Sequence, residues 1–326
     1  MAVAQESLPV DHRPIERKAI GIFGKLAGAQ SALEANEAKW GYLLLIPWLL
    51  GLIIFWIGPI LASAYFSFME YDVVSSPEFI GADNYVRAFS ADKQFWPSLG
   101  RTLYYSVLVV PLGLIGSLFL AILLNQGIKG TNIFRTFFFL PHLTPAVALA
   151  VLWIWLFHPT VGPINAVLES FGVEGPGWLT SKDWALNALI IISLWAGVGG
   201  NTMLIFLAGL QGVPQELYEA AEIDGAGGWS KFRNVTLPMI SPTMLFNLIL
   251  GIIGALKVFT LAFVATNGGP SWATWFYALH IYRQSFEYFR MGYGAALAWI
   301  FVIILLAFTY VQLVMSRRWV FYAGGD

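Results

Sequence analysis

Residues 211–238 of the chain read QGVPQELYEAAEIDGAGGWSKFRNVTLP, a polar insert that separates two long apolar runs. Pro214 suits a first helical position and Gly225 suits a helix stop, so the insert is predicted to contain a short helix over residues 215–224. One side of this helix is apolar, and the other carries the carboxylates of Glu216, Glu219 and Glu222. Such a helix would lie on a membrane surface and offer a protruding contact surface to another protein.

The composition is that of an integral membrane protein. Of the 326 residues, 58% are hydrophobic and 11% are charged, whereas about 25% are charged in typical soluble domains. The net charge of −1 offers no basic surface to phosphates, so nucleic acid is not expected as a partner. Cysteine is absent from the sequence, which excludes disulfides, thiolate zinc sites and cysteine nucleophiles.

Several apolar stretches reach the length of about 20 residues that a helix needs to cross a bilayer. They are residues 41–68, 103–124, 136–157, 184–207, 244–266 and 293–315. The sequence therefore predicts an all-α integral membrane fold with six transmembrane helices. Residues 41–318 would form the membrane domain, with residues 211–240 as a polar loop inside it.

Basic residues near the ends of the spans predict the orientation, because cytoplasmic loops carry the excess of Lys and Arg. The amino-terminal side has eleven: Arg13, Arg17, Lys18, Lys25, Lys39, Lys129, Arg135, Lys231, Arg233, Arg317 and Arg318. The opposite side has six: Arg87, Lys93, Arg101, Lys182, Arg283 and Arg290. Both termini and the polar insert are therefore expected in the cytoplasm, where ATP is available.

The two ends of the chain are predicted to be cytoplasmic tails. Residues 1–40 combine basic residues with apolar ones at near-helical spacing, which fits a tail holding a basic amphipathic helix at the lipid surface. A partly disordered tail fits the same residues. The apolar run that follows is too long for the core of a signal peptide, so we expect it to be retained as the first span. Residues 319–326 would form the second tail.

Signatures of catalysis and of metal binding are missing from the sequence. None of the histidines, His12, His142, His158 and His280, has a second histidine or a cysteine three or four residues away, so no metal site is expected. No stretch fits the G-x-x-x-x-G-K-[ST] spacing that cradles nucleotide phosphates. The chain is therefore expected to be no enzyme and to bind no cofactor, and if ATP powers it, another chain binds the ATP.

Charged residues are nearly absent from the predicted spans. No predicted span contains Asp or Glu, which disfavours a proton-driven carrier. A sodium-coupled carrier that binds its ion through backbone carbonyls remains an alternative. Lys257 lies well inside the fifth span, where an unpaired ammonium costs at least about 2.5–3.5 kcal/mol. It could face a cavity or subunit interface near a substrate path, or snorkel towards the membrane surface. Trp195 could stack on a sugar face, although packing is the commoner role of such a ring.

The polar insert resembles the EAA loop of binding-protein-dependent ABC importer permeases in its Glu219-Ala220-Ala221 triplet, its Gly225 and its Val235-Thr236-Leu237-Pro238 ending. In that family the loop is the cytoplasmic coupling helix, which sits in a cleft of the ATPase subunit. The resemblance implies the fold of a type I ABC importer permease. It also implies a role in ATPase coupling for Glu219, Ala220, Ala221, Asp224, Gly225, Leu237 and Pro238.

A second resemblance concerns the solute. Residues 266–270 read TNGGP, and with Thr274, the His280-Ile281-Tyr282 triplet and Phe286 they look like the carbohydrate-uptake subfamily, most of all its maltose and glycerol-3-phosphate permeases. The resemblance implies a second homologous permease, two ABC ATPase subunits that hold ATP and Mg²⁺, and an extracellular or periplasmic solute-binding protein. It places the chain in the inner membrane of a bacterium or archaeon.

The helix before TNGGP contributes to the sugar site of the maltose permease, so the resemblance implies a substrate path here. The candidate path residues are Trp195, Asn201, Gly251, Gly254, Ala255, Lys257 and Val258. Small residues stand where polar sugar-binding side chains are expected, which indicates a bulkier solute, an anionic solute drawn by Lys257, or binding mainly by the partner permease.

The function expected from these features is ATP-driven import of a sugar or oligosaccharide by alternating access. In that mechanism the ATPase dimer closes, pushes on the coupling helix and opens the cavity outward. An ABC importer for glycerol-3-phosphate or another non-sugar solute, and a secondary carrier, are the alternatives.

Overall fold

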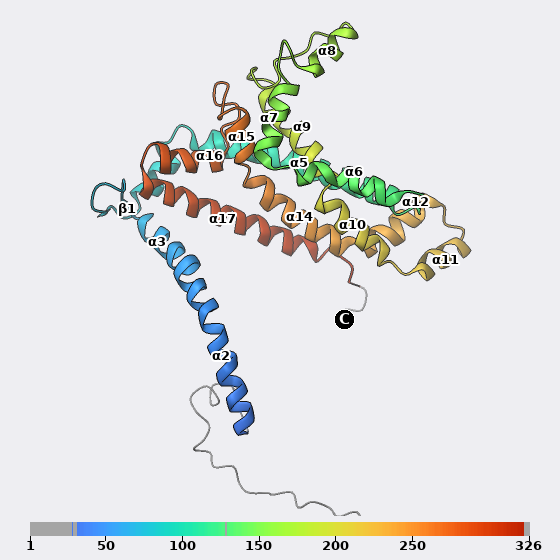
Figure 1. Cartoon of the computed structure of the whole chain (residues 1–326), viewed down its shortest axis with the longest axis horizontal. Coiled ribbons are helices and arrows are strands. Elements are labelled where there is room, and N and C mark those ends of the chain that lie inside the picture. Colours follow the sequence, from blue (N-terminus) through green and yellow to red (C-terminus); the bar gives the residue numbers. More distant parts are fainter. Residues whose placement is uncertain (1–27, 29–30, 128, 323–326) are drawn as a thin grey trace, which may run out of the picture. The chain divides into compact units, whose positions relative to one another are not determined.

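A computed structural model describes residues 28, 31–127 and 129–322 of the chain. The described residues are mainly helical, as the sequence predicts (Figure 1). The chain divides into two compact units, residues 1–65 and 66–326.

The first unit is one long apolar helix with a single irregular turn. α2 (Ala32–Leu52) begins at Ser31, whose Oγ accepts a hydrogen bond of 3.2 Å from the backbone N–H three residues further on. It continues into a π-helical turn, η2 (Ile53–Ile57), and then into α3 (Gly58–Phe66). The wide turn lies just before Pro59, which has no N–H to donate and whose ring needs room beside the carbonyl four residues back.

The first predicted span, residues 41–68, largely coincides with this helix. The helix starts earlier, at Ala32, because Ser31 caps it there. Large side chains such as Leu44, Trp48 and Phe55 are exposed, as expected for a helix that faces lipid or another protein. The amphipathic helix predicted for the amino-terminal tail falls mostly outside the described residues.

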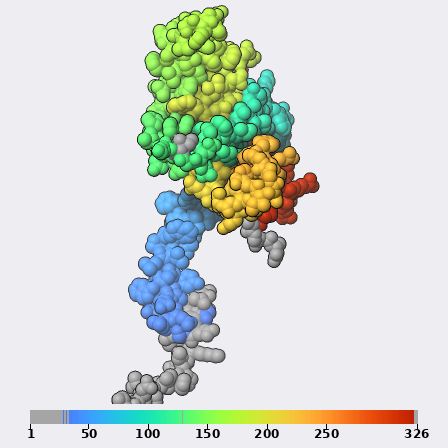
Figure 2. Space-filling view, turned by 90° about the vertical axis from the view of Figure 1, so that its right-hand side faces the viewer, coloured from blue at the N-terminus to red at the C-terminus, as the bar shows by residue number. Residues whose placement is uncertain are grey.

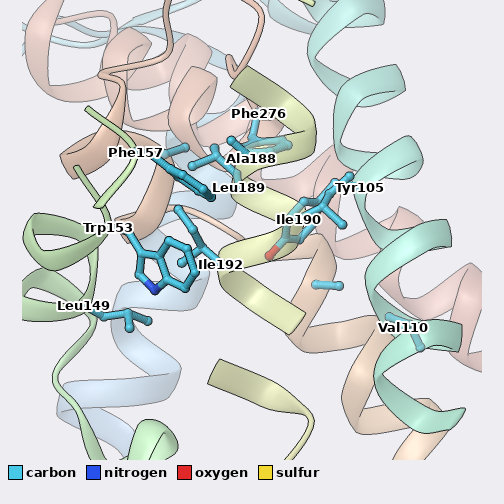
Figure 3. Packing of buried hydrophobic residues seen from close by; sticks show 12 residues of the cluster. Tyr105, Val110, Leu149, Trp153, Phe157, Ala188, Leu189, Ile190, Ile192 and Phe276 are labelled. Carbon is cyan, nitrogen blue, oxygen red and sulfur yellow. The ribbon is translucent and has the colours of Figure 1, made fainter. Parts of the chain in front are cut away.

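One helix of the second unit, α5 (Phe95–Leu124), contributes to all three of its apolar clusters. Phe95 packs in the first cluster, Tyr105 in the middle one and Leu124 in the third. Figure 3 shows the middle cluster, in which α9 (Ala185–Gly197) lies between Tyr105 on one side and the aromatic rings of Trp153 and Phe157 on the other. The packing therefore makes α5 the central helix of this unit.

The third predicted span, residues 136–157, is sharply bent. It consists of α6 (Thr131–Leu143) and α7 (Ala146–Leu156), whose axes differ by 93°. Pro145 explains the break, because a proline disfavours helical backbone in the residue before it, and Thr144 is extended at φ −69° and ψ 127°. The predicted span is therefore present as two helices, and it counts as one span only if the bent pair crosses the membrane together.

The fourth predicted span, residues 184–207, is also broken. It consists of α9 and α10 (Asn201–Gln211), which meet at 44°. Glycine at the break lets α6 come close, because a Cβ on Gly199 would overlap the carbonyl oxygen of Phe138. A Cβ on Gly200 would lie 2.7 Å from the ring of His142.

The other predicted spans correspond to single helical stretches with shifted ends. α5 starts at Phe95 rather than at residue 103. The fifth span consists of α14 (Ser241–Leu256) and α15 (Thr260–Ala265), and the sixth is α17 (Met291–Ser316). Within the described residues, four helical stretches are long and apolar enough to cross a membrane, or up to six if each bent pair is one span. A multi-pass fold is thus confirmed, whereas the count of six rests on the bent pairs.

Shorter elements connect these helices. A two-stranded antiparallel ribbon, β1 (Met69–Glu70) with β2 (Glu78–Phe79), pairs Met69 with Phe79 and precedes α4 (Asp83–Ser90). The remaining connecting elements are α8 (Pro163–Ser170), α11 (Gln215–Ile223), α12 (Gly228–Lys231), η3 (Phe232–Thr236), α13 (Leu237–Met239), α16 (Tyr277–Tyr282) and η4 (Arg283–Glu287). Figure 1 shows α11 and α12 at one end of the second unit, and β1 and α16 at the other. We call these the α11 end and the β1 end.

Candidate functional site

The polar insert begins with the helix that the sequence predicts. α11 (Gln215–Ile223) confirms the prediction over residues 215–224 to within one residue. Pro214 does not occupy the first helical position as predicted but lies just before it, with extended backbone at φ −58° and ψ 133°. The missing N–H of proline costs little there, because the first N–H groups of a helix have no partner inside it.

Gly225 ends the helix in a left-handed conformation, with φ +78°. The Ala226 N–H donates to the Ala221 carbonyl at 2.9 Å, and the Gly225 N–H donates to the Glu222 carbonyl at 3.0 Å. These two bonds form a Schellman motif, which satisfies the last carbonyls of a helix and favours glycine at the left-handed position. The expected helix stop at Gly225 thus has a backbone cause.

Side chains attach α11 to the segment that follows it. The Tyr218 hydroxyl and Thr236 Oγ1 are 3.0 Å apart, and Thr236 is buried. Lys231 Nζ pairs with Glu222 Oε1 at 2.6 Å. Because both contacts bridge α11 to α12 and η3, the insert is a small folded unit rather than a loose loop.

The outer surface of the insert is exposed and partly apolar. Ile223 is 88% exposed and Trp229 is 72% exposed. Glu219 is also exposed, and among the described residues its carboxylate has no hydrogen-bond or ion-pair partner. Figure 2 looks onto the α11 end and shows the gold surface of this insert facing the viewer. A free carboxylate among exposed apolar side chains is typical of a surface that another protein covers.

A cavity of about 350 Å³ lies between α5, α9, α10 and α14. Glycine forms much of its wall, at Gly113, Gly197, Gly251 and Gly254. Polar side chains also line it, namely Tyr105, Ser117, His142, Ser193, Asn201, Thr202 and Asn247. The cavity therefore combines space with hydrogen-bonding groups in a part of the molecule that is otherwise apolar.

Some of these polar groups are already paired across helices. The Tyr105 hydroxyl donates to Ser193 Oγ at 2.6 Å, and Ser117 Oγ donates to the Val198 carbonyl at 2.7 Å. Asn247 differs, because its Nδ2 is buried and has no acceptor among the described residues. A buried amide donor without a partner is costly, so this group is suited to a ligand that brings an acceptor oxygen.

Comparison with known proteins identifies the type of protein to which these features belong. Residues 110–320 match the family described as "Binding-protein-dependent transport system inner membrane component". The chain belongs to this family. The chain is therefore a multi-pass membrane permease component of a binding-protein-dependent ABC transport system, and below it is called the permease.

Relatives are similar over most of their length. The permease is 38% identical over 290 residues to a probable ABC transporter permease protein of Bacillus subtilis, covering 88% of this chain and 93% of that protein. It is 36% identical over 292 residues to the trehalose/maltose transport system permease protein of Thermococcus litoralis, covering 88% and 97%. A solved bacterial ABC transporter involved in the import of the acidic polysaccharide alginate has a chain 25% identical, with TM-score 0.76, covering 87% and 96%.

The residues expected to couple to the ATPase lie together at the α11 end of the permease. Glu219 and Ala220 are exposed on α11, and Ala221 is half-buried. Asp224 is the residue at which α11 ends. Leu237 and Pro238 are half-buried in α13, on the path from α11 to α14. Their coupling role stays a prediction.

The candidate substrate-path residues separate into two groups. Asn201, Gly251, Gly254 and Ala255 line the cavity. The others do not line it: Trp195, Lys257 and Val258. The structure therefore brings together four of the seven, and a path role for any of them stays a prediction.

The three residues outside the cavity have other surroundings. The Trp195 ring packs edge-on against Trp153, with centroids 5.6 Å apart. Lys257 is exposed just after the last residue of α14, and Val258 packs against the middle apolar cluster.

Sequence reasoning missed the polar residues that line the cavity on the other helices. Tyr105, His142, Ser193 and Asn247 were not considered for the substrate path. For Asn247 a signal was present, because it precedes Gly251 by four residues and so lies on the same helix face. For His142 there was no such signal, because it reaches the cavity only through the close approach of α6 to Gly200.

A buried polar network closes the β1 end of the permease. Asp92 Oδ2 accepts hydrogen bonds from His280 Nε2 at 2.7 Å and from the Tyr293 hydroxyl at 2.5 Å. Trp275 Nε1 donates to His280 Nδ1 at 3.1 Å, so the imidazole proton is on Nε2. Burial by itself raises the pKa of Asp92, but the hydrogen bonds from His280 and Tyr293 outweigh it and hold the pKa well below its usual range. His280, part of the segment that resembles sugar permeases, thus fixes α16 to the loop before α5.

Proposed function

We propose that the permease forms the translocation path of an ATP-driven importer for a sugar or oligosaccharide and that it works by alternating access. The observation that carries this proposal is the cavity between α5, α9, α10 and α14. Its volume of about 350 Å³ is within the range of about 300–1,000 Å³ found for small-molecule sites. Its hydroxyl and amide groups suit a solute rich in hydroxyls. The carbohydrates in the names of the trehalose/maltose and alginate relatives support the same solute class.

Coupling to ATP follows from how α11 is connected. A short link joins α11 to α10, and α12, η3 and α13 join it to α14. α10 and α14 are both walls of the cavity. A push on α11 by a closing ATPase dimer would therefore move two cavity walls together, and ATP hydrolysis would then reset them.

The proposal requires partners that supply what this chain lacks. A second, homologous permease would complete the path, two ATPase subunits would hold ATP and Mg²⁺, and a solute-binding protein would deliver the solute. Glu219 would make an ionic contact with the ATPase, because it is an exposed carboxylate of α11 and lies one helical turn before the exposed Ile223. The α11 end would face the cytoplasm together with both termini.

The test is ATP hydrolysis by the complete complex, purified through a tag on this chain and reconstituted in vesicles. Binding protein loaded with each member of a sugar panel is added in turn. We expect one loaded binding protein to stimulate hydrolysis and uptake. Glu219→Lys should abolish this stimulation, since truncating a charged contact across an interface costs about 2–5 kcal/mol.

The matched control is Glu169→Lys, which makes the same change at an exposed position of α8. Stimulation should survive in this variant. Equal loss in both variants would remove the special role of α11. Uptake by this chain alone, with no ATPase copurifying, would overturn the proposal in favour of a secondary carrier.

A further inference from the structure

A second pocket lies at the β1 end of α5, apart from the cavity. It has a volume of about 530 Å³ and lies between α5, the turn before α9 and the segment after the TNGGP motif. Its polar lining consists of Arg101, Tyr104, Lys182, Asp183, Asn187 and Ser271. None of these residues is among the candidates for the substrate path.

Arg101 is the unusual member of this set. Its Nη1 is shielded from solvent and has no hydrogen-bond acceptor among the described residues. No ion pair to Arg101 is present in the described part of the chain either, although Asp183 lines the same pocket. A guanidinium that is partly desolvated and unpaired is costly, and its planar fork of donors matches the two oxygens of a carboxylate or phosphate.

The charges of the pocket favour an anion as the missing partner. Arg101 and Lys182 contribute two positive charges and Asp183 contributes one negative charge. The lining also includes Ser271, whose backbone has φ +48°. Non-glycine residues with positive φ are strained and occur preferentially at ligand-binding segments.

The pocket and the cavity are lined by two of the same helices, α5 and α9. α5 lines the pocket up to Tyr104 and the cavity from Tyr105 onwards. α9 likewise lines the pocket up to Asn187 and the cavity from Ser193 onwards. A solute that reaches the cavity from the β1 end along these helices would therefore meet Arg101 first.

Two hydrogen bonds lie where the lining of the pocket gives way, along α5 and α9, to the lining of the cavity. The Tyr104 hydroxyl donates to Asn187 Oδ1 at 3.3 Å, and the Tyr105 hydroxyl donates to Ser193 Oγ at 2.6 Å. Both join α5 to α9. The first pair lines the pocket and the second pair lines the cavity, so these contacts mark the border between the two.

We propose that this pocket binds an anionic oxygen group, a carboxylate, phosphate or sulfonate, on the solute that the permease transports. Arg101 holds the anion and Lys182 adds to the positive field. The inference rests on the proposed function, and it narrows the solute from a sugar in general to one that carries a negative charge.

The test measures direct binding to the complete complex in nanodiscs of phosphatidylcholine, without ATP. The anionic probes are inorganic phosphate, glucuronate and sn-glycerol 3-phosphate, and the neutral probes are glucose and glycerol. We expect Arg101→Gln to weaken binding of the anionic probes by about tenfold to a hundredfold, the range of one charge-assisted hydrogen-bonded contact. Asp183→Asn should strengthen it, because it removes the opposing charge. Binding of the neutral probes should not change.

Lys93→Gln is the control variant, because it removes a positive charge at the same end of α5 from a residue that does not line the pocket. It should leave anion binding unaltered. If Arg101→Gln prevents assembly, the salt dependence of binding to the unmodified complex tests the proposal instead. The affinity for anionic probes should fall as ionic strength rises, whereas the affinity for neutral probes should not change. Equal affinities in the Arg101→Gln and unmodified complexes, or no salt dependence, would overturn the proposal.

A lipid headgroup offers the same phosphate chemistry and is distinguished by adding phosphatidylglycerol to the nanodiscs. If the pocket binds lipid, this addition stabilises the complex through Arg101 while the soluble anions do not bind, and the proposal is overturned. Failure of the inference differs from failure of the proposed function. ATP hydrolysis that responds to loaded binding protein, with no Arg101-dependent anion binding, refutes only the anionic solute.

Discussion

At Gly225 the chain needs a backbone conformation that other residues adopt only at a cost. Its φ of +78° closes the Schellman motif of α11, and a Cβ there would meet nothing within 4 Å. The cost of a substitution is therefore one of backbone conformation and not of collision. We expect Gly225→Ala to destabilise the last turn of α11 by about 1–2 kcal/mol, and Gly225→Asn by less, because asparagine tolerates the left-handed region.

The measurement for Gly225 is hydrogen exchange of the α11 amides, with the ratio of ATP hydrolysed to solute imported as the functional readout. Gly172 provides a matched control, because it ends α8 at φ +74° with the same pair of hydrogen bonds. Gly172→Ala should loosen α8 equally and leave the transport ratio unchanged. Normal coupling in Gly225→Ala, despite faster exchange in α11, would contradict the coupling role of this turn.

Asp92 gives the permease a predictable response to acid. A carboxyl whose pKa is lowered on folding contributes stability above its unfolded pKa of about 4 and loses that contribution as the pH falls below it. We expect Asp92→Asn to lower stability at neutral pH by about 2 kcal/mol, the scale of a buried hydrogen bond to a charged group. Thermal unfolding of the purified complex from neutral pH to about pH 3 checks this. The difference between the proteins should shrink below about pH 4, and a constant difference would contradict the argument.

Single residues also show where sequence reasoning succeeds. Gly225 was predictable, because a glycine after an amphipathic segment is a local signal for a helix end. Arg101 was assigned to an outer loop because the apolar count started at residue 103, whereas the helix starts at Phe95. A span delimited by its run of apolar residues leaves out the more polar turns with which a helix can begin. Lys257 lies inside the fifth span, between α14 and α15, but it does not line the cavity, and its role near a substrate path stays a prediction.

At the scale of elements, the broken helices of the second unit depend on close backbone contact. α6 approaches the break between α9 and α10 at Gly199, where a Cβ would overlap the Phe138 carbonyl oxygen. Gly197 is the last residue of α9, two positions before Gly199, and a Cβ there would meet nothing within 4 Å. The existence of six apolar segments was visible in the sequence, but the 93° and 44° bends were not. The bends arise from one proline and from tertiary contacts that a single segment does not reveal.

We expect Gly199→Ala to lower the stability of the permease by about 1–3 kcal/mol, because overpacking forces α6 away from the break. Gly197→Ala should be neutral or slightly stabilising, since alanine favours helix by about 0.5–1 kcal/mol over glycine. Thermal unfolding of the two variants in the same complex compares them directly. Equal melting temperatures would mean that α6 does not pack on the break as described.

At the scale of the whole molecule, uptake should fall as larger side chains are introduced into the cavity. Gly254 lines the cavity and has open space where a Cβ would lie. We expect the series Gly254→Ala, Gly254→Val and Gly254→Leu to reduce uptake progressively, by tenfold or more for leucine, while the ATPase subunits still copurify. Initial uptake rates in vesicles measure the effect. Unchanged uptake in Gly254→Leu would place the solute path elsewhere.

The cavity and the α11 insert use separate sets of residues, although α10 and α14 join them. This separation has an evolutionary consequence. Substitutions in the cavity lining can accumulate without altering the side chains on α11. Related permeases can therefore change their solute specificity while they keep the same ATPase partner. Selection on solute preference and selection on ATPase compatibility would then act on two different sets of residues, those that line the cavity and those exposed on α11.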